Sequence, residues 1–202
     1  MPRPAPTPIL LFLLTVFVVF VNPVMAQEVH RYDITVAGFA IGEMEAKKWG
    51  VQDTTYFQLT SKVSFWLFGQ INVDYLTEVS YVRDRLISSR VESSTNRGDF
   101  LSRVWREGSV YKVDAKSYKY EFKDEISEEV NYSAVRLFFE EPMETDRMLA
   151  ENYGVFGEVY KVEDGGYESL ANGNRNRYEY KGGKLQRAVM QNPIKNYVIK
   201  RK

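Results

Sequence analysis

The chain contains no cysteine and only one histidine among its 202 residues. The absence of cysteine excludes disulfide bonds, thiolate nucleophiles and iron–sulfur clusters. Neither sign of charge is in excess, because 27 basic residues balance 27 acidic ones. Nucleic-acid binding usually requires a basic field, so this balance argues against a nucleic-acid partner.

Long apolar runs are also scarce, and the one that is present lies at residues 9–21. Its 13 residues fall short of the roughly 20 that a transmembrane helix needs. Pro23 breaks the run, and the small-residue site Val24-Met25-Ala26 follows it. We therefore expect a secretory signal peptide over residues 1–26, no membrane span after its cleavage, and a protein exported to the periplasm or the extracellular space.

The expected mature chain, residues 27–202, has the size of one domain with one core. It contains no repeat, low-complexity tract or linker, so we expect a single secreted β domain. From Glu28 onward the pattern has a period of two: Tyr32 and Ile34 share one face, for example, with polar residues between them. One buried face and one wet face are typical of antiparallel sheet.

Breaks rich in glycine, asparagine and aspartate separate these segments, as at 96–99 and 182–183. Such residues tolerate a positive φ, so we expect neighbouring strands to be joined by tight hairpins. The spacing predicts about 10–12 strands, which is too many for one flat sheet. The predicted fold class is therefore mainly β: a strongly curved antiparallel meander that forms a half-barrel or a barrel. Gly38 and Gly42 are its expected bend points.

One segment departs from the alternation and predicts a short helix near 133–141. Val135, Phe138 and Phe139 follow each other at helical spacing, Pro142 ends the segment, and Ser133 is a plausible N-cap. A helix with two phenylalanines on one side needs an apolar surface to rest on. We expect it to plug the concave face of the curved sheet.

The sequence offers little chemistry for catalysis. The single histidine, His30, shares the parity of an apolar strand face and is expected to lie at a strand end beside the core. Adjacent acidic pairs such as Glu140-Glu141 point in different directions rather than across a cleft, and no nucleophile elbow, phosphate loop or metal-ligand spacing is present. We therefore expect no catalytic residue, no metal site and no cofactor, and a protein that is not an enzyme.

Aromatic residues are the one excess, at 14% of the chain. The run Phe65-Trp66-Leu67-Phe68 is apolar on both parities, so it is either covered on both sides or lines the lip of a cavity. Burial under Phe138 and Phe139 is the simpler interpretation. The functional hypothesis is a mouth for a hydrophobic ligand, with Phe65, Trp66, Phe68, Phe138 and Phe139 as the candidate ligand-binding residues.

The opening segment, from Tyr32-Asp33 through Gly38 to Ile41-Gly42, resembles that of uncharacterised bacterial secreted or periplasmic families, which are β-rich domains of unknown function. The segment 172–183 resembles their closing hairpins. The resemblance implies a long antiparallel meander over nearly the whole mature chain, and it transfers no catalytic residue. By looser analogy such meanders are similar to the half-barrels of lipoprotein carriers, which hold acyl chains in an apolar concavity.

These observations favour a non-enzymatic cell-envelope protein that binds a hydrophobic or amphipathic ligand in a curved-sheet cavity. The alternative is a structural or assembly partner of envelope proteins, in which edge strands pair with another chain. A small outer-membrane barrel and an enzyme are the remaining alternatives. The expected partner is thus an apolar small molecule or an envelope protein.

Overall fold

The computed structural model of the chain describes residues 27–66, 69–96, 98–117, 120–192 and 195–202. The expected signal peptide, residues 1–26, lies outside the described residues, and so does Phe68. The strand bounds are β1 Glu28–Val36, β2 Phe39–Val51, β3 Thr54–Trp66, β4 Gln70–Val82, β5 Arg85–Thr95, β6 Gly98–Glu107, β7 Val110–Ser117, β8 Tyr120–Ile126, β9 Arg147–Ala150, β10 Val155–Lys161, β11 Tyr167–Ala171, β12 Asn174–Lys181, β13 Lys184–Met190 and β14 Tyr197–Arg201.

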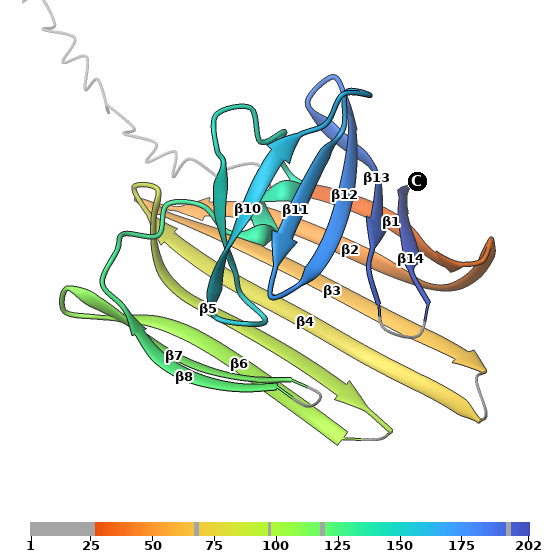
Figure 1. Cartoon of the computed structure of the whole chain (residues 1–202), viewed down its shortest axis with the longest axis horizontal. Coiled ribbons are helices and arrows are strands. Elements are labelled where there is room, and N and C mark those ends of the chain that lie inside the picture. Colours follow the sequence, from red (N-terminus) through yellow and green to blue (C-terminus); the bar gives the residue numbers. More distant parts are fainter. Residues whose placement is uncertain (1–26, 67–68, 97, 118–119, 193–194) are drawn as a thin grey trace, which may run out of the picture.

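All fourteen strands form one antiparallel sheet (Figure 1). Its order is β8-β7-β6-β5-β4-β3-β2-β1-β14-β13-β12-β11-β10-β9, so consecutive strands are neighbours within each half. The two halves join where β1 pairs with β14, which brings both ends of the strand series together. The strands β8 and β9 are left as the two edges of the sheet.

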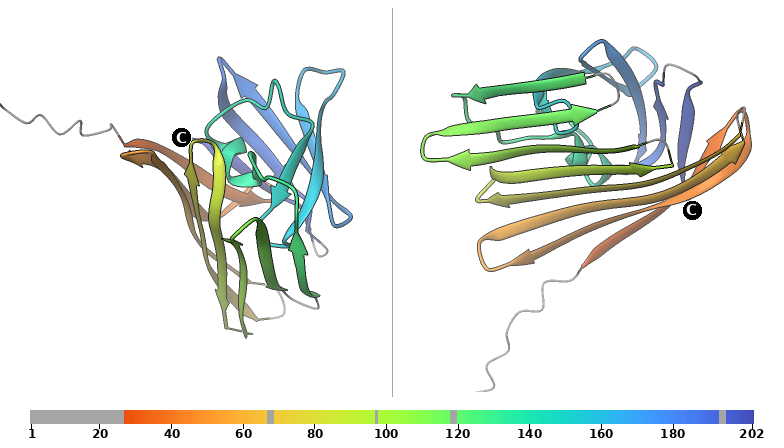
Figure 2. Two further views of the ribbon diagram at one scale, coloured as in Figure 1. Left: turned by 90° about the vertical axis from the view of Figure 1, so that its left-hand side faces the viewer. Right: turned by 90° about the horizontal axis from the view of Figure 1, so that it is seen from below.

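The sheet curls so that the shorter strands β9–β14 stand across from the long strands β3–β6 (Figure 2). We call the enclosed side the concave face. A bulge near Ile34 in the β1–β2 pair contributes to the curvature. Gly42 lies in this bulge, and a Cβ atom there would stand 2.1 Å from the carbonyl oxygen of Lys62. This close approach confirms Gly42 as a position that requires glycine, while Gly38, with φ +86°, forms the β1–β2 turn.

The antiparallel, strongly curved meander is therefore confirmed, and the sheet is not closed. It has fourteen strands rather than about 10–12. The extra ones are explained by short strands such as β9, β11 and β14, which have four or five residues. Segments this short show too few alternations to be recognised by period.

The expected short helix is a single 3₁₀ turn, η1, over Ala134–Phe138. Ser133 is the N-cap residue, as expected, in an extended conformation, but its side chain forms no capping hydrogen bond. Ser133 instead pairs with Leu149 in an isolated bridge and accepts a hydrogen bond from the Tyr81 hydroxyl at 2.7 Å. The Ser133 side chain thus bonds to a residue distant in sequence rather than to the first turn of η1.

Candidate functional site

The concave face is the candidate site. Strand pairing sets inward residues opposite one another, so alternate residues of each long strand line this face. In β3 these inward residues begin with the buried Phe57 and Leu59 and continue with the half-buried Val63 and Phe65. Their partners in β4 run from the buried Val79 to the buried Ile71. The face therefore extends over the whole length of these strands, from a deeply buried end to a more exposed one.

The buried end is filled by a segment that we call the plug, residues 130–139, which includes η1. The Phe139 ring lies 5.3 Å from that of Phe57 and 5.3 Å from the His30 imidazole. The Phe138 ring meets the Tyr32 ring edge-on at 6.0 Å. Such edge-to-face pairs add to the free energy gained by burying the rings. The expectation that this segment rests on the concave face is confirmed.

Side chains from two strands hold the plug backbone. The carbonyl oxygen of Phe138 accepts hydrogen bonds from His30 Nδ1 at 3.0 Å and from the Tyr32 hydroxyl at 3.1 Å. The carbonyl oxygen of Leu137 accepts one from the Tyr180 hydroxyl at 2.6 Å. These bonds satisfy carbonyl groups that a 3₁₀ turn leaves open, and they fix the plug in position.

His30 thus has a structural role here, beside the core as expected. Its Nδ1 atom donates to the plug, while its Nε2 atom lies 2.8 Å from a Glu28 carboxylate oxygen. Among the residues that the structure describes, no group of three or more histidine, cysteine, aspartate or glutamate side chains is placed to hold a metal ion.

A buried carboxylate anchors the other end of the plug. Glu151, in the β9–β10 turn, is only 4% exposed and accepts a hydrogen bond from the backbone N–H of Val135 at 2.8 Å. Burial raises the pKa of the Glu151 carboxyl above its ordinary value, against the opposing effect of hydrogen bonds from Ser133 and from backbone groups. The carboxyl is therefore easier to keep protonated than one in water.

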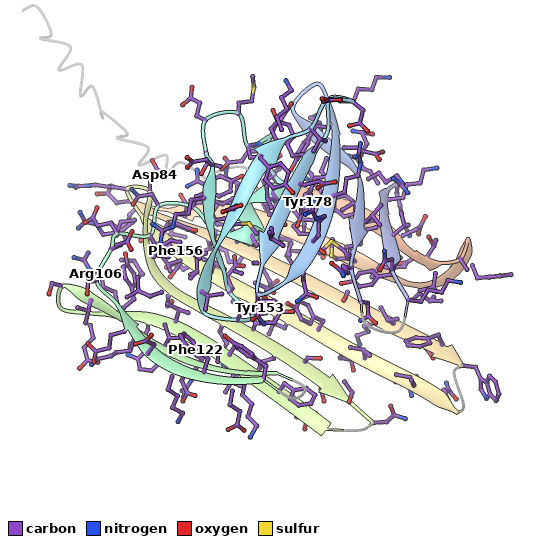
Figure 3. The ribbon with its side chains drawn as sticks, in the orientation of Figure 1. Asp84, Arg106, Phe122, Tyr153, Phe156 and Tyr178 are labelled. Carbon is purple, nitrogen blue, oxygen red and sulfur yellow. The ribbon has the colours of Figure 1, made fainter. Side chains whose placement is uncertain are left out.

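Tyrosine hydroxyls surround the middle of the concave face. Tyr75, Tyr178 and Tyr197 come from β4, β12 and β14, and Figure 3 labels Tyr178 on its strand. Burial raises the pKa of Tyr178 to about 12 and that of Tyr197 to about 12, and it raises the pKa of Tyr75 as well. All three phenols stay neutral at physiological pH, so this zone offers hydrogen bonds without charge.

The β9–β10 turn connects the two edges of the sheet through side chains rather than through strand pairing. The carbonyl oxygen of Tyr153 accepts a hydrogen bond from the Tyr120 hydroxyl at 3.0 Å, and that of Asn152 accepts one from Ser102 Oγ at 2.9 Å. Gly154 rests on β7, where an added Cβ atom would stand 2.2 Å from Cγ1 of Val113. Figure 3 labels Tyr153 of this turn and Phe122 of β8.

At the opposite end of the concave face, the described part of the chain provides no such plug. The β3–β4 end runs past the shorter strands of the other half (Figure 1). There Phe65 pairs with Ile71, and Val63 pairs with Val73. Of these four side chains only Ile71 is fully buried, and the other three are partly exposed. We call this group the open end.

Of the five residues predicted to form one ligand mouth, the four that the structure describes are not brought together. Phe138 and Phe139 fill the buried end, whereas Phe65 lies eight residues beyond Phe57 on β3, roughly 26 Å along the strand. Trp66 has the opposite parity and is 78% exposed on the outer face. Phe65 and Trp66, the two described residues of the aromatic run, are therefore not buried under the plug. Phe68 lies outside the described residues.

Sequence reasoning missed Glu151 and the tyrosine hydroxyls. Glu151 is a single acid directly after the short strand β9, and neither spacing nor pairing distinguishes it from a surface residue. The alternation of β4 places Tyr75 on the inward face, but its polar neighbours on that face depend on strand pairing. The pairing sets Tyr75 opposite Ser61 on one side and Ser93 on the other.

Two surface pockets lie away from these residues. One of about 330 Å³ is lined by Asp53, Val82, Arg83, Arg85, Ile87 and Arg106, and another of about 470 Å³ lies beside β9 and β10. Neither is lined by Phe65, Phe138 or Phe139. Within the described part of the chain, no helix has the length and apolar character needed to cross a membrane.

Comparison with known proteins supports the fold and identifies the family. No curated protein matches the chain. The crystal structure of a beta-barrel-like protein of the domain of unknown function DUF1849 from Brucella abortus is similar, with a TM-score of 0.51 over 89% of this chain and 96% of that one. At 12% sequence identity this likeness concerns the fold alone. The model of a family described as a domain of unknown function, DUF6134, matches residues 32–202, and the chain belongs to that family.

Proposed function

We propose that this chain is a non-enzymatic protein of the cell envelope that binds a hydrophobic or amphipathic ligand at the open end. The observation that carries the proposal is the contrast along the concave face. One end is filled by Phe138 and Phe139, while Val63, Phe65 and Val73 keep exposed apolar surface at the other end. Apolar side chains on a concave surface favour apolar ligands, because contact removes their surface from water.

The order of side chains along the strands favours an amphipathic ligand over a purely apolar one. One inward position further along β4 from Val73 lies Tyr75, whose neighbours across the strands are Ser61 and Ser93. These hydroxyls can donate to or accept from a polar group, and the raised pKa of Tyr75 keeps its phenol neutral. A ligand would lay its apolar part on the open end and its uncharged polar part against these hydroxyls.

The proposed role in the envelope rests on the export that the sequence predicts for residues 1–26. The residues expected to direct export precede β1, and the charged outer face carries ion pairs such as Arg103 with Asp114 and Arg187 with Glu179. The ligand would therefore be bound outside the cytoplasm.

The proposed binding surface is an open concavity rather than an enclosed chamber, so exchange of ligand would need no large opening of the sheet.

The test is binding of a fluorescent fatty acid by protein purified after expression of the full chain. Phe65→Ala combined with Val73→Ala removes apolar surface from the open end and should weaken binding about tenfold, since each truncation costs of the order of 0.5–1 kcal/mol of contact. Trp66→Ala is the matched control, because Trp66 neighbours Phe65 but lies on the outer face.

The control should leave the affinity unchanged within about twofold. Equal weakening by Trp66→Ala would place the probe on the outer face, and equal affinity of the double variant and the original protein would contradict the proposed site. A protein that binds no apolar probe would contradict the proposed function itself.

A further inference from the structure

The two edges of the sheet differ in how they are protected. At the edge strand β9, the Leu149 N–H donates to the carbonyl oxygen of Tyr132 at 2.9 Å, and Ser133 forms a bridge to Leu149. The plug therefore covers this edge. At β8, within the described residues, no backbone hydrogen bond links the side away from β7 to another strand or loop. An uncovered edge is a template for pairing with another strand.

One hydrogen bond shows which backbone groups of β8 point outward. The N–H of Glu125 donates to the carboxylate of its neighbour Asp124 at 2.8 Å rather than to β7. Backbone groups of alternate residues point to the same side of a strand. The N–H and C=O groups of Glu121 and Lys123 therefore also face outward, where a partner strand could bond to them.

We propose that β8 pairs with β8 of a second copy of this chain, antiparallel and about a two-fold axis at Phe122. Both copies would contribute the same edge, as a two-fold interface requires. Residues that oppose each other in a sheet lie on the same face. The two-fold axis must therefore pass through a residue rather than between two residues, and Phe122, Lys123 and Asp124 are the central residues of β8 to compare.

Charge distinguishes these three registers. Centring on Lys123 sets Lys123 against its own copy and Glu121 against Glu125. Centring on Asp124 pairs Lys123 with Glu125 twice but sets two aspartates face to face at the axis. Like charges directly opposite destabilise a sheet. Centring on Phe122 sets the two Phe122 rings against each other and pairs Glu121 with Lys123 twice. The side chains of Glu121 and Lys123 are 70% and 78% exposed, so both are accessible to a partner.

The backbone is consistent with the same register. If Glu121 and Lys123 face outward, each Glu121–Lys123 pair is a hydrogen-bonded pair that exchanges two N–H···O=C bonds. Two such pairs are related by the two-fold axis. The aromatic pair at the centre, the two ion pairs and the backbone bonds therefore all favour one arrangement. The short interface implies a weak, concentration-dependent dimer.

Charge reversal tests the register, because single and double reversals have opposite effects on the charge pairs across the interface. Sedimentation velocity over a range of concentrations, on protein purified from expression of the full chain, should show a monomer–dimer equilibrium. Glu121→Lys and Lys123→Glu each place two like-charge pairs across the interface and should each raise the dimer dissociation constant about tenfold. The double variant Glu121→Lys/Lys123→Glu restores opposite charges and should restore the original constant.

A matched control separates the interface from the ion pair within one chain. Lys116 Nζ lies 2.5 Å from a Glu121 carboxylate oxygen but sits on β7, away from the proposed contact. Lys116→Glu should leave the dimer unchanged, and circular dichroism should show the same strand content for all variants. A chain that stays monomeric at every concentration, a dimer that neither single reversal weakens, or a double variant without recovery would each overturn the proposal.

Discussion

The buried end and the open end of the concave face are built from the same strands but are used differently. At the buried end, aromatic rings of the plug meet those of β1 and β3, and His30, Tyr32 and Tyr180 bond the plug carbonyls. At the open end, Phe65 and Val63 of β3 pair with Ile71 and Val73 of β4. No such cover lies over them within the described part of the chain. The difference predicts that stability is concentrated where the plug lies, whereas the other end of the same face is where we propose that a ligand binds.

The strongest way to break this comparison is to truncate one phenylalanine at each end. Phe138→Ala removes a ring that is 6% exposed and leaves a cavity between the plug and β1. We expect it to lower the free energy of unfolding by about 3–5 kcal/mol. Urea denaturation followed by tryptophan fluorescence measures the change.

Phe65→Ala is the matched control, because the Phe65 ring is partly exposed at the open end. It should cost about 1 kcal/mol or less, since a half-buried ring forms fewer contacts and leaves no closed cavity. Equal losses from the two substitutions would show that both ends contribute to stability alike and would remove the basis of the comparison.

A smaller effect on stability is expected at the β9–β10 turn, which packs against β7. Gly154→Ala places a Cβ atom 2.2 Å from Cγ1 of Val113, at a residue with φ +67°. The turn must then shift away from β7, and we expect a loss of about 2 kcal/mol. Combining Gly154→Ala with Val113→Ala tests the cause, because the smaller side chain removes the clash but keeps the strain of the positive φ.

The combined variant should show a favourable coupling between the two positions in thermal or urea denaturation. Strictly additive losses would indicate that only the backbone conformation matters and that the contact with β7 is dispensable. Gly165→Ala, at another glycine with positive φ but with nothing near its added Cβ, isolates the backbone contribution.

The smallest effect concerns the carboxylate that anchors the plug, and it depends on pH. Burial raises the pKa of Glu151 above its ordinary value of 4.5. A carboxyl with a raised pKa binds more protons in the folded than in the unfolded protein, so its favourable contribution is complete below pH 4.5 and is lost as the pH rises through the raised pKa. Glu151→Gln keeps an acceptor for the Val135 N–H but cannot ionise.

The stability of Glu151→Gln relative to the original protein should therefore increase with pH, by at most about 1.4 kcal/mol for each pH unit in that window. Urea denaturation at a series of pH values measures the difference. Glu128→Gln serves as the control. The neighbouring Arg147 lowers the pKa of this exposed carboxyl, so the trend should be weak and of opposite sign. A difference for Glu151→Gln that does not vary with pH would contradict the raised pKa.

Much of the fold could be predicted from the sequence, because alternation is a local property. The parity of Tyr32 and Ile34, or of Phe57 and Leu59, identifies the buried face of each strand before any partner is known. The plug was recognisable for a related reason, since Val135 and Phe138 interrupt the alternation. The site was less accessible. Parity places Phe65 and Trp66 on opposite faces of one strand, but the two are equally apolar in sequence, and only the tertiary structure decides which of the two faces is covered.

The amino-acid sequence by itself determined a curved antiparallel meander without cysteine, with inward apolar residues and a short segment that must be covered. Only the tertiary structure decided that the plug fills one end, that Glu151 becomes buried beneath it, and that β8 is an edge strand of the sheet. The physical reason is the range of the interactions. Alternation and turn preferences act within a few residues, whereas strand pairing, burial and the pKa of Glu151 depend on residues brought together across the whole chain.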